Sequence, residues 1–309
     1  MKYLVIVNPI SGRGRGERLL PIIKDNLHQY GLNFEIVSTK NQWHAANLAR
    51  QASIDGYEVI VGAGGDGTVN EIINGIMSAS TFGVKQPALG ILGIGTGNDF
   101  AASMGVSTRL DEACHCLSED RRRIIDVGIV KEGKSANGRY FGNCVGIGFD
   151  AAGTIQSYKI TWASGDLAYL IAALQTIFVY FKAPTLKIQY DDQAHTIQAL
   201  MVSIMNGRRI GGRFWTAPES QSDDGVFDLC IAKLVSRVRM FSLIPHFMKG
   251  TQSTQSEILM AQARKVRISA IKGTMPVQVD GEILCESGVE LDIDILPLQL
   301  EIVGLDKTL

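Results

Sequence analysis

The sequence predicts a two-domain chain, in which an N-terminal α/β domain with a parallel sheet precedes a mostly antiparallel, β-rich domain. The length of 309 residues suits two domains of about 150 residues each. Apolar strand-length runs alternate with helix-like segments up to about Asp126. After that point strand patterns separated by hairpin turns predominate. The predicted boundaries are 1–127 and 128–309.

The N-terminal part repeats a strand–helix unit. Apolar runs predict strands at 2–9, 33–39, 57–64 and 88–95, and 3.6-residue periodicity predicts helices at 16–31, 44–53 and 68–78. Alternation of this kind implies right-handed crossovers and a parallel sheet. Ligands of such sheets bind beyond the carboxyl ends of the strands.

The C-terminal part alternates apolar and polar residues at strand length. The triplets "DDQ" (191–193) and "DGE" (280–282) predict hairpin turns. We expect helices at 166–180 and 236–248, and a Gly-, Arg- and Ser-rich loop at 205–224 that lines a cleft. The apolar helix 166–180 is expected to belong to the core of this domain, with an acyl-chain slot as the alternative.

Composition excludes several classes of protein. Apolar residues make up 46% of the chain, as in ordinary folded proteins. The 30 Lys and Arg residues nearly balance the 31 Asp and Glu residues, so the net charge provides no long-range attraction to nucleic acid. Five scattered cysteines without a recognisable signal sequence predict a cytoplasmic protein. The "CHC" at 114–116 lacks the partner motif of a zinc site, and we expect partly buried helix residues there. The longest apolar run, 167–181, has 15 residues and is too short to span a bilayer.

Three glycine-rich loops follow predicted strands of the first domain: "NPISGRGRG" (8–16), "GGDGTVNE" (64–71) and "GIGTGNDFA" (93–101). Glycines let backbone amides approach a phosphate, and the start of the following helix attracts the same anion. Neither GxGxxG nor the P-loop pattern is present. An aspartate in such a loop, Asp66, indicates that a divalent cation accompanies the phosphates. Turns and a helix cap are the alternative for any one loop, but three loops at adjacent strand ends favour a metal–nucleotide site.

These motifs, together with "DDGVFDL" (223–229) and "VDGE" (279–282), resemble those of the diacylglycerol kinase catalytic domain family, and most closely its soluble bacterial lipid kinases. The resemblance covers essentially the whole chain. It implies an α/β nucleotide-binding domain, also seen in NAD kinases, and a β-sandwich-like C-terminal domain that carries the lipid site. The last strand is expected to pack back toward the first domain.

The resemblance also implies functional residues. Residues matching the family's ATP contacts are Asn8, Pro9, Ile10, Ser11, Gly12, Thr39, Gly65, Asp66, Gly67, Thr68, Val69, Asn70, Glu71 and Thr96. Glu282 matches the proton acceptor. A structural Mg²⁺ is expected at Gln221, Asp224 and Val226, the first and last through backbone carbonyls. We assign Asp66 and Asp223, one from each domain, to the catalytic Mg²⁺–ATP.

The expected reaction is ATP- and Mg²⁺-dependent phosphorylation of a lipid hydroxyl, with diacylglycerol converted to phosphatidic acid. Phosphatidylglycerol, a sphingoid base or an undecaprenol-like alcohol are alternative acceptors, because an apolar slot discriminates weakly between chains. Two alternative functions are an NAD kinase-like enzyme and a non-catalytic regulator that binds lipid or nucleotide. The expected partner is a lipid at the inner face of the membrane, where arginines near the site, such as Arg13 and Arg209, attract anionic headgroups. The resemblance also allows a homodimer.

Overall fold

The computed structural model describes residues 1–80, 82–133, 138–160, 162, 165–180 and 183–304. Contacts within the chain divide it into two units. Unit 1 comprises residues 1–125 together with the C-terminal segment from residue 298, and unit 2 comprises residues 126–297. Strands β5 (Arg122–Glu132) and β15 (Glu290–Val303) carry the chain across the two boundaries.

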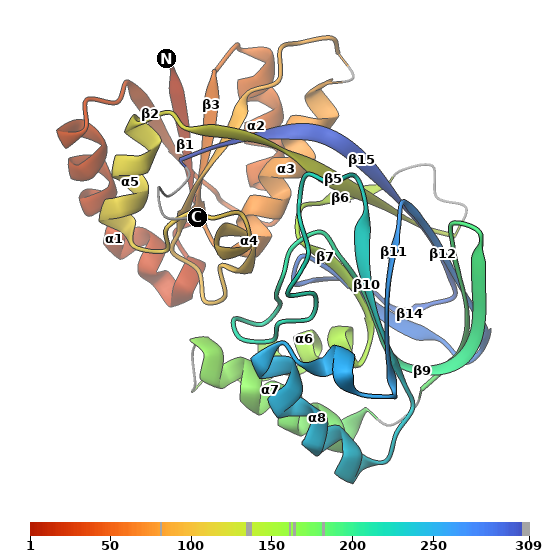
Figure 1. Cartoon of the computed structure of the whole chain (residues 1–309). Coiled ribbons are helices and arrows are strands. Elements are labelled where there is room, and N and C mark those ends of the chain that lie inside the picture. The colour runs from red at the N-terminus through yellow and green to blue at the C-terminus, as the bar shows by residue number, and fades with distance from the viewer. Residues whose placement is uncertain (81, 134–137, 161, 163–164, 181–182, 305–309) are drawn as a thin grey trace. The chain divides into compact units, whose positions relative to one another are not determined.

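Unit 1 is an α/β domain around a parallel sheet (Figure 1). Its further elements are β1 (Tyr3–Val7), α1 (Ser11–Gln29), β2 (Phe34–Ser38), α2 (His44–Ile54), β3 (Val59–Gly64), α3 (Asp66–Ser80), β4 (Ala88–Gly93), α4 (Asp99–Ser103) and α5 (Leu110–Ser118). The strand order is β2-β1-β3-β4-β15, and every neighbouring pair is parallel. The four strands and three helices predicted from the periodicity of this region are confirmed.

The sheet of unit 1 is buried because its strands are apolar on both sides. All residues of β1, β3 and β4 are buried, as the continuous apolar runs of a helix-covered parallel sheet require. Helix α1 packs against α5, and α2 against α3. Gly75 lets α2 and α3 approach closely, because a Cβ at this position would overlap the backbone of Ala46.

Unit 2 is mostly antiparallel. Its further elements are β6 (Arg139–Phe141), β7 (Cys144–Gly148), α6 (Phe149–Lys159), α7 (Gly165–Val179), β8 (Thr185–Tyr190), β9 (Gln193–Met205), β10 (Phe227–Lys233), α8 (Arg237–Lys249), a 3₁₀ turn (Gln252–Thr254), β11 (Ile258–Ala263), β12 (Lys265–Lys272), β13 (Met275–Val279) and β14 (Glu282–Gly288). The strand order is β14-β13-β7-β9-β8-β12-β15, and β10 pairs with β9 and β11. Long strand β9 pairs with β8 through its first half and with β7 and β10 through its second half.

The predicted hairpins and helices of unit 2 are largely confirmed. Asp280 and Gly281 form a two-residue turn in which both φ angles are positive, 47° and 85°, as in the turns that match the twist of paired strands. Helices α7 and α8 lie within one residue of the predicted ranges.

Two predictions for unit 2 were wrong or incomplete. The run "YFGNCVGIGFD" (140–150) has a strand-like pattern, from which we expected a strand, but the chain breaks at Gly148 (φ 77°) and helix α6 begins at Phe149. Helix α7 is also only partly a core helix. Ala172 and Ile177 are buried, whereas Phe178 and Val179 are 64% and 68% exposed.

Candidate functional site

The three glycine-rich loops of unit 1 converge. The Asn8 side-chain amide donates to Thr68 Oγ1 (2.9 Å), which joins the loop after β1 to the first turn of α3. The Asp66 carboxylate accepts a hydrogen bond from the amide of Phe100 (3.0 Å), which joins α3 to the loop after β4. Thr39 lies beside the first loop, because its amide donates to the carbonyl of Val7 (2.8 Å).

Glycines at this convergence are required by close backbone approach. A Cβ at Gly95 would overlap the backbone of Gly65, and one at Gly16 would overlap the carbonyl of Asn8. Gly12 has a φ of 55°, and Arg13 and Gly14 also adopt left-handed conformations, so the first turn of α1 is irregular. Turns that combine right- and left-handed residues can direct successive amides toward one concavity, a geometry that binds anions.

The predicted ATP-binding residues differ in accessibility. Asn8, Ser11, Gly12, Gly65, Asp66 and Gly67 are half-buried, and Ile10 and Thr96 are exposed. Thr68, Val69 and Asn70 are buried, and Val69 packs beside Gly62. The Glu71 carboxylate accepts from the amide of Ala45 (3.0 Å), at the start of α2. The loops are therefore brought together, while several side chains of α3 serve the packing of unit 1.

The acidic turn of unit 2 precedes β10. Asp223 and Asp224 are exposed, and Asp224 Oδ1 accepts from the amide of Val226 (3.1 Å). Burial, with the nearby carboxylates of Asp224 and Glu219, raises the pKa of Asp228 above its usual value, against hydrogen bonds that lower it. Carboxylate oxygens are ligands that Mg²⁺ prefers, so this turn is a candidate cation site.

The sequence analysis missed Asp126, which holds this turn in place. Asp126 is fully buried, its amide donates to the carbonyl of Ser222 (2.6 Å), and its carboxylate accepts from the amide of Gly225 (2.7 Å). No motif surrounds Asp126 in the sequence. Its role follows only from the folded contact between segments about a hundred residues apart.

Glu282 opens β14 immediately after the Asp280–Gly281 turn and is half-buried. Asp280 fixes the turn through three backbone amides. Its carboxylate accepts from Gly142 (2.8 Å), Asn143 (2.9 Å) and Cys144 (2.8 Å). A carboxylate with three amide donors is a rigid anchor, so Glu282 projects from a fixed backbone position.

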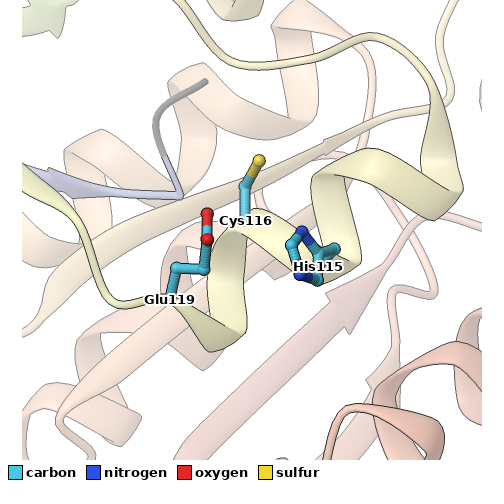
Figure 2. Close-up of side chains that lie close together, drawn as sticks. All are labelled: His115, Cys116 and Glu119. Atoms are coloured by element: carbon cyan, nitrogen blue, oxygen red, sulfur yellow. The ribbon is translucent and has the colours of Figure 1, made fainter. Parts of the chain in front are cut away.

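One group of metal-ligand types lies away from these loops. Figure 2 shows His115, Cys116 and Glu119 at the end of α5, where their ligand atoms lie within 4.8 Å of one another. Glu119 is paired with Arg121 (2.9 Å), Cys116 is buried, and the His115 ring packs edge-on against Tyr30. A cation would have to displace Arg121, so we assign no metal to this group.

Comparison with known proteins identifies the family of this chain. Residues 2–130 match the family model of the diacylglycerol kinase catalytic domain, and residues 143–304 match that of the YegS C-terminal NAD kinase beta sandwich-like domain. The diacylglycerol kinase of Bacillus subtilis (strain 168) is 27% identical over 280 residues, which cover 90% of this chain and 88% of the relative. That of Staphylococcus saprophyticus is 28% identical over 285 residues, with the same coverage of both chains.

Solved structures show the same fold. A proposed diacylglycerol kinase from Bacillus anthracis str. Sterne superposes with a TM-score of 0.80 at 26% identity, covering 100% of this chain and 98% of that one. Yeast NADH kinase in complex with NADH gives a TM-score of 0.50 at 13% identity, covering 99% of this chain and 84% of that one, and is similar in fold alone.

The fold is of the NAD kinase-like class, with an α/β domain and a β-sandwich-like domain. Within that class the chain belongs to the diacylglycerol kinase catalytic domain family and is a lipid kinase.

Proposed function

We propose that this lipid kinase transfers the γ-phosphoryl group of ATP to the free hydroxyl of diacylglycerol and so forms phosphatidic acid. The observation that carries the ATP assignment is the convergence of the three glycine-rich loops, joined by the bonds from Asn8 to Thr68 and from Phe100 to Asp66. The names of the relatives favour diacylglycerol as the acceptor.

Unit 1 would bind the triphosphate. The glycines of these loops would let a phosphate approach the backbone closely, and the start of α3 would attract the same anion. Asp66 would contribute a carboxylate to the Mg²⁺ that accompanies ATP. A bound Mg²⁺ would neutralise charge on the transferred phosphoryl group.

Glu282 would accept the proton of the lipid hydroxyl. In the balanced reaction, the hydroxyl oxygen forms a bond to the γ-phosphorus, the bond from this phosphorus to the β–γ bridging oxygen breaks, and ADP leaves. The hydroxyl proton passes to the Glu282 carboxylate. A carboxylate within hydrogen-bond reach of the acceptor is required for this step, and the anchored turn before Glu282 keeps the side chain in a defined place.

A second, structural Mg²⁺ is proposed at the acidic turn. Asp224 would supply a carboxylate oxygen, and Gln221 and Val226 would supply backbone carbonyls. The support is the neighbouring carboxylate of Asp228, whose pKa is raised, first by burial and then by Asp224 and Glu219. A cation at this turn would relieve the repulsion among these groups.

Unit 2 exposes an apolar surface that suits a bilayer. We define the α7–α8 face as Phe178, Val179, Val238 and Phe241, which are 64%, 68%, 80% and 38% exposed. The rings of Phe178 and Phe241 lie 5.6 Å apart, and exposed Arg237 contacts the carbonyl of Phe178. Apolar side chains beside a cation are typical of helices that lie in an anionic membrane interface. No helix among the described residues is both long and apolar enough to cross a membrane.

The proposal is tested with labelled ATP and Mg²⁺ against lipids in mixed micelles. The panel contains diacylglycerol, phosphatidylglycerol and a sphingoid base, with NAD as the soluble control. Label in phosphatidic acid supports the proposal. Label only in another lipid would reassign the acceptor, and label only in NADP would contradict a lipid substrate.

A further inference from the structure

Helix α6 carries two polar side chains, Asp150 and Tyr158, that the proposed reaction does not use. We infer that Asp150 and Tyr158 are positioning residues that hold the backbone of Gly281, and with it the Glu282 carboxylate, in the geometry needed to accept the hydroxyl proton. The inference rests on the proposed role of Glu282 as the base. It concerns contacts that lie wholly within unit 2.

Both polar backbone groups of Gly281 are bound by side chains. Its amide donates to Gln278 Oε1 (2.7 Å), and its carbonyl accepts from the hydroxyl of Tyr158 (2.7 Å). Gly281 itself is exposed, has a φ of 85°, and would meet no atom within 4 Å if it carried a Cβ. No neighbour crowds Gly281 itself, so these two hydrogen bonds add to the anchoring of Asp280 in fixing its backbone.

Asp150 orients the amide of Gln278. Gln278 is 1% exposed, and its Nε2 donates to Asp150 Oδ1 (3.3 Å), while Ser203 donates to Asp150 Oδ2 (2.9 Å). A carboxylate accepts only, so it binds the nitrogen end of the Gln278 amide and turns the oxygen end toward Gly281. Rotating the Gln278 side-chain amide by half a turn would place its NH₂ group, a donor, against the backbone N–H of Gly281, which is also a donor.

Gly146 provides the space for this arrangement. In the sheet, Gly146 pairs with Gln278 on one neighbouring strand and with Ser203 on the other. A Cβ at Gly146 would overlap the Asp150 carboxylate and the Gln278 amide. The carboxylate of α6 thus lies over a gap in the sheet and binds the side chains on both sides of it.

The charge of Glu282 also acts on Tyr158. Burial raises the pKa of the Tyr158 hydroxyl, and the nearby Glu282 carboxylate raises it further, whereas Arg139 opposes the shift. The single hydroxyl proton is donated to the carbonyl of Gly281, so one residue of α6 fixes the backbone immediately before the base.

The test compares Tyr158→Phe with the matched control Tyr190→Phe, which removes a hydroxyl from core strand β8. Loss of this one neutral hydrogen bond, worth about 1 kcal/mol, predicts a roughly 5-fold fall in kcat for Tyr158→Phe, with the KM values for ATP and lipid within about two-fold of wild type. Thermal unfolding of Tyr158→Phe should stay near that of wild type, which a purely structural role would not give. Tyr190→Phe should retain the wild-type kcat.

Hydrogen exchange measured without substrates gives an activity-independent readout. Exchange at residues 279–284 should accelerate in Tyr158→Phe and in Gln278→Met, which removes the acceptor for the Gly281 amide. Asp150→Ala, which removes the acceptor that orients Gln278, should accelerate exchange at the same residues, because the Gln278 amide can then rotate.

Three outcomes would overturn the inference. The first is wild-type kcat together with wild-type hydrogen exchange at residues 279–284 in Tyr158→Phe, which contradicts the positioning role but leaves the proposed function standing. The second is a fall in kcat accompanied by equal changes in KM and thermal stability, which indicates a structural role. The third is a wild-type protein that phosphorylates no lipid. This outcome contradicts the proposed function, and with it the role of Glu282 as the base.

Discussion

The Asp66 carboxylate accepts a hydrogen bond of 3.0 Å from the backbone amide of Phe100, which places the acid of one glycine-rich loop against the loop of the next strand. This contact locates the acid at the carboxyl edge of the parallel sheet, where ligands of such sheets bind. It also means that an isosteric substitution can separate the charge of Asp66 from its structural role.

Asp66→Asn should abolish transfer without unfolding the protein. The asparagine oxygen can still accept from the amide of Phe100, but the charge that would hold Mg²⁺ is lost. We expect kcat to fall about 10²- to 10³-fold, a range typical for loss of one transition-state electrostatic contact. Steady-state kinetics and thermal unfolding measure the two effects. Asp25→Asn, at an exposed position of α1, is the control, and retained turnover in Asp66→Asn would remove the assignment.

Gly95→Ala should weaken ATP binding. A Cβ at this position overlaps the backbone of Gly65, so the two loops must separate. Overpacking of this kind costs about 1–3 kcal/mol of stability, and we expect a several-fold higher KM for ATP with a lower Tm. Calorimetric titration with a non-hydrolysable ATP analogue checks the binding. Unchanged affinity would show that the approach of Gly65 and Gly95 does not shape the site.

Mg²⁺ should stabilise the protein in the absence of ATP. If the ion binds the acidic turn of the folded state alone, a concentration of about 100 times its Kd adds about 2.7 kcal/mol to the free energy of unfolding. Thermal unfolding with and without a chelator measures this shift. Asp224→Asn should lose most of it, whereas Asp192→Asn, at an exposed hairpin turn, should keep it. A shift equal in both variants would contradict a site at Asp224.

Asp150→Asn should stabilise the protein above pH 6. Burial raises the pKa of Asp150 from 3.8 to about 6, against the lowering effect of hydrogen bonds from Ser203 and Gln278. A raised pKa contributes stability that is complete below pH 3.8 and is lost as the pH rises through about 6. The variant has no charge to bury, so its advantage should be small near pH 4 and reach about 1–3 kcal/mol at pH 8.

Urea unfolding of wild type and of Asp150→Asn across this pH range measures the difference between their free energies of unfolding. The contributions of the other titrating groups are nearly equal in the two proteins and largely cancel in this difference. The thiol of Cys230 senses the charge of Asp150, because that charge adds to the burial that raises the pKa of Cys230 to about 12. A stability difference independent of pH would contradict ionisation of a buried Asp150.

Substitutions in the α7–α8 face should reduce membrane binding. Phe178→Ser with Phe241→Ser removes two exposed rings whose centroids lie 5.6 Å apart. We expect at least about 10-fold weaker binding to vesicles that contain phosphatidylglycerol, since each ring contributes more than 1 kcal/mol when it is buried in an apolar phase. Vesicle sedimentation measures the binding. Ile271→Ser, which removes a 61% exposed side chain from β12, should bind like wild type; equal losses would argue against a defined membrane face.

The elements of unit 1 were predictable because their signals are local. Strand β3 is a continuous apolar run, and α3 repeats apolar residues at helical spacing after a glycine-rich turn. Helix α6 was missed because its signal is weak. Only Ala151 and Ala152 are buried within it, and its start at Phe149 is set by the positive φ of Gly148 rather than by a capping side chain.

The candidate site was predictable where a motif carries it. The loops around Asn8 and Asp66 and the turn before Glu282 are visible in the sequence, and the structure brings the loops of unit 1 together. The groups that support Glu282 were not predictable. Gln278 meets Asp150 only because β13 pairs with β7, and a contact across 128 residues leaves no local pattern.

The most direct test of the account is the rate of phosphate transfer from labelled ATP to diacylglycerol by Glu282→Gln, compared with Glu286→Gln at an exposed position of the same strand. If Glu282 accepts the hydroxyl proton, kcat falls about 10²- to 10⁴-fold in the first variant and is unchanged in the second. Near wild-type transfer by Glu282→Gln would show that this side chain is not the base and would contradict the mechanism.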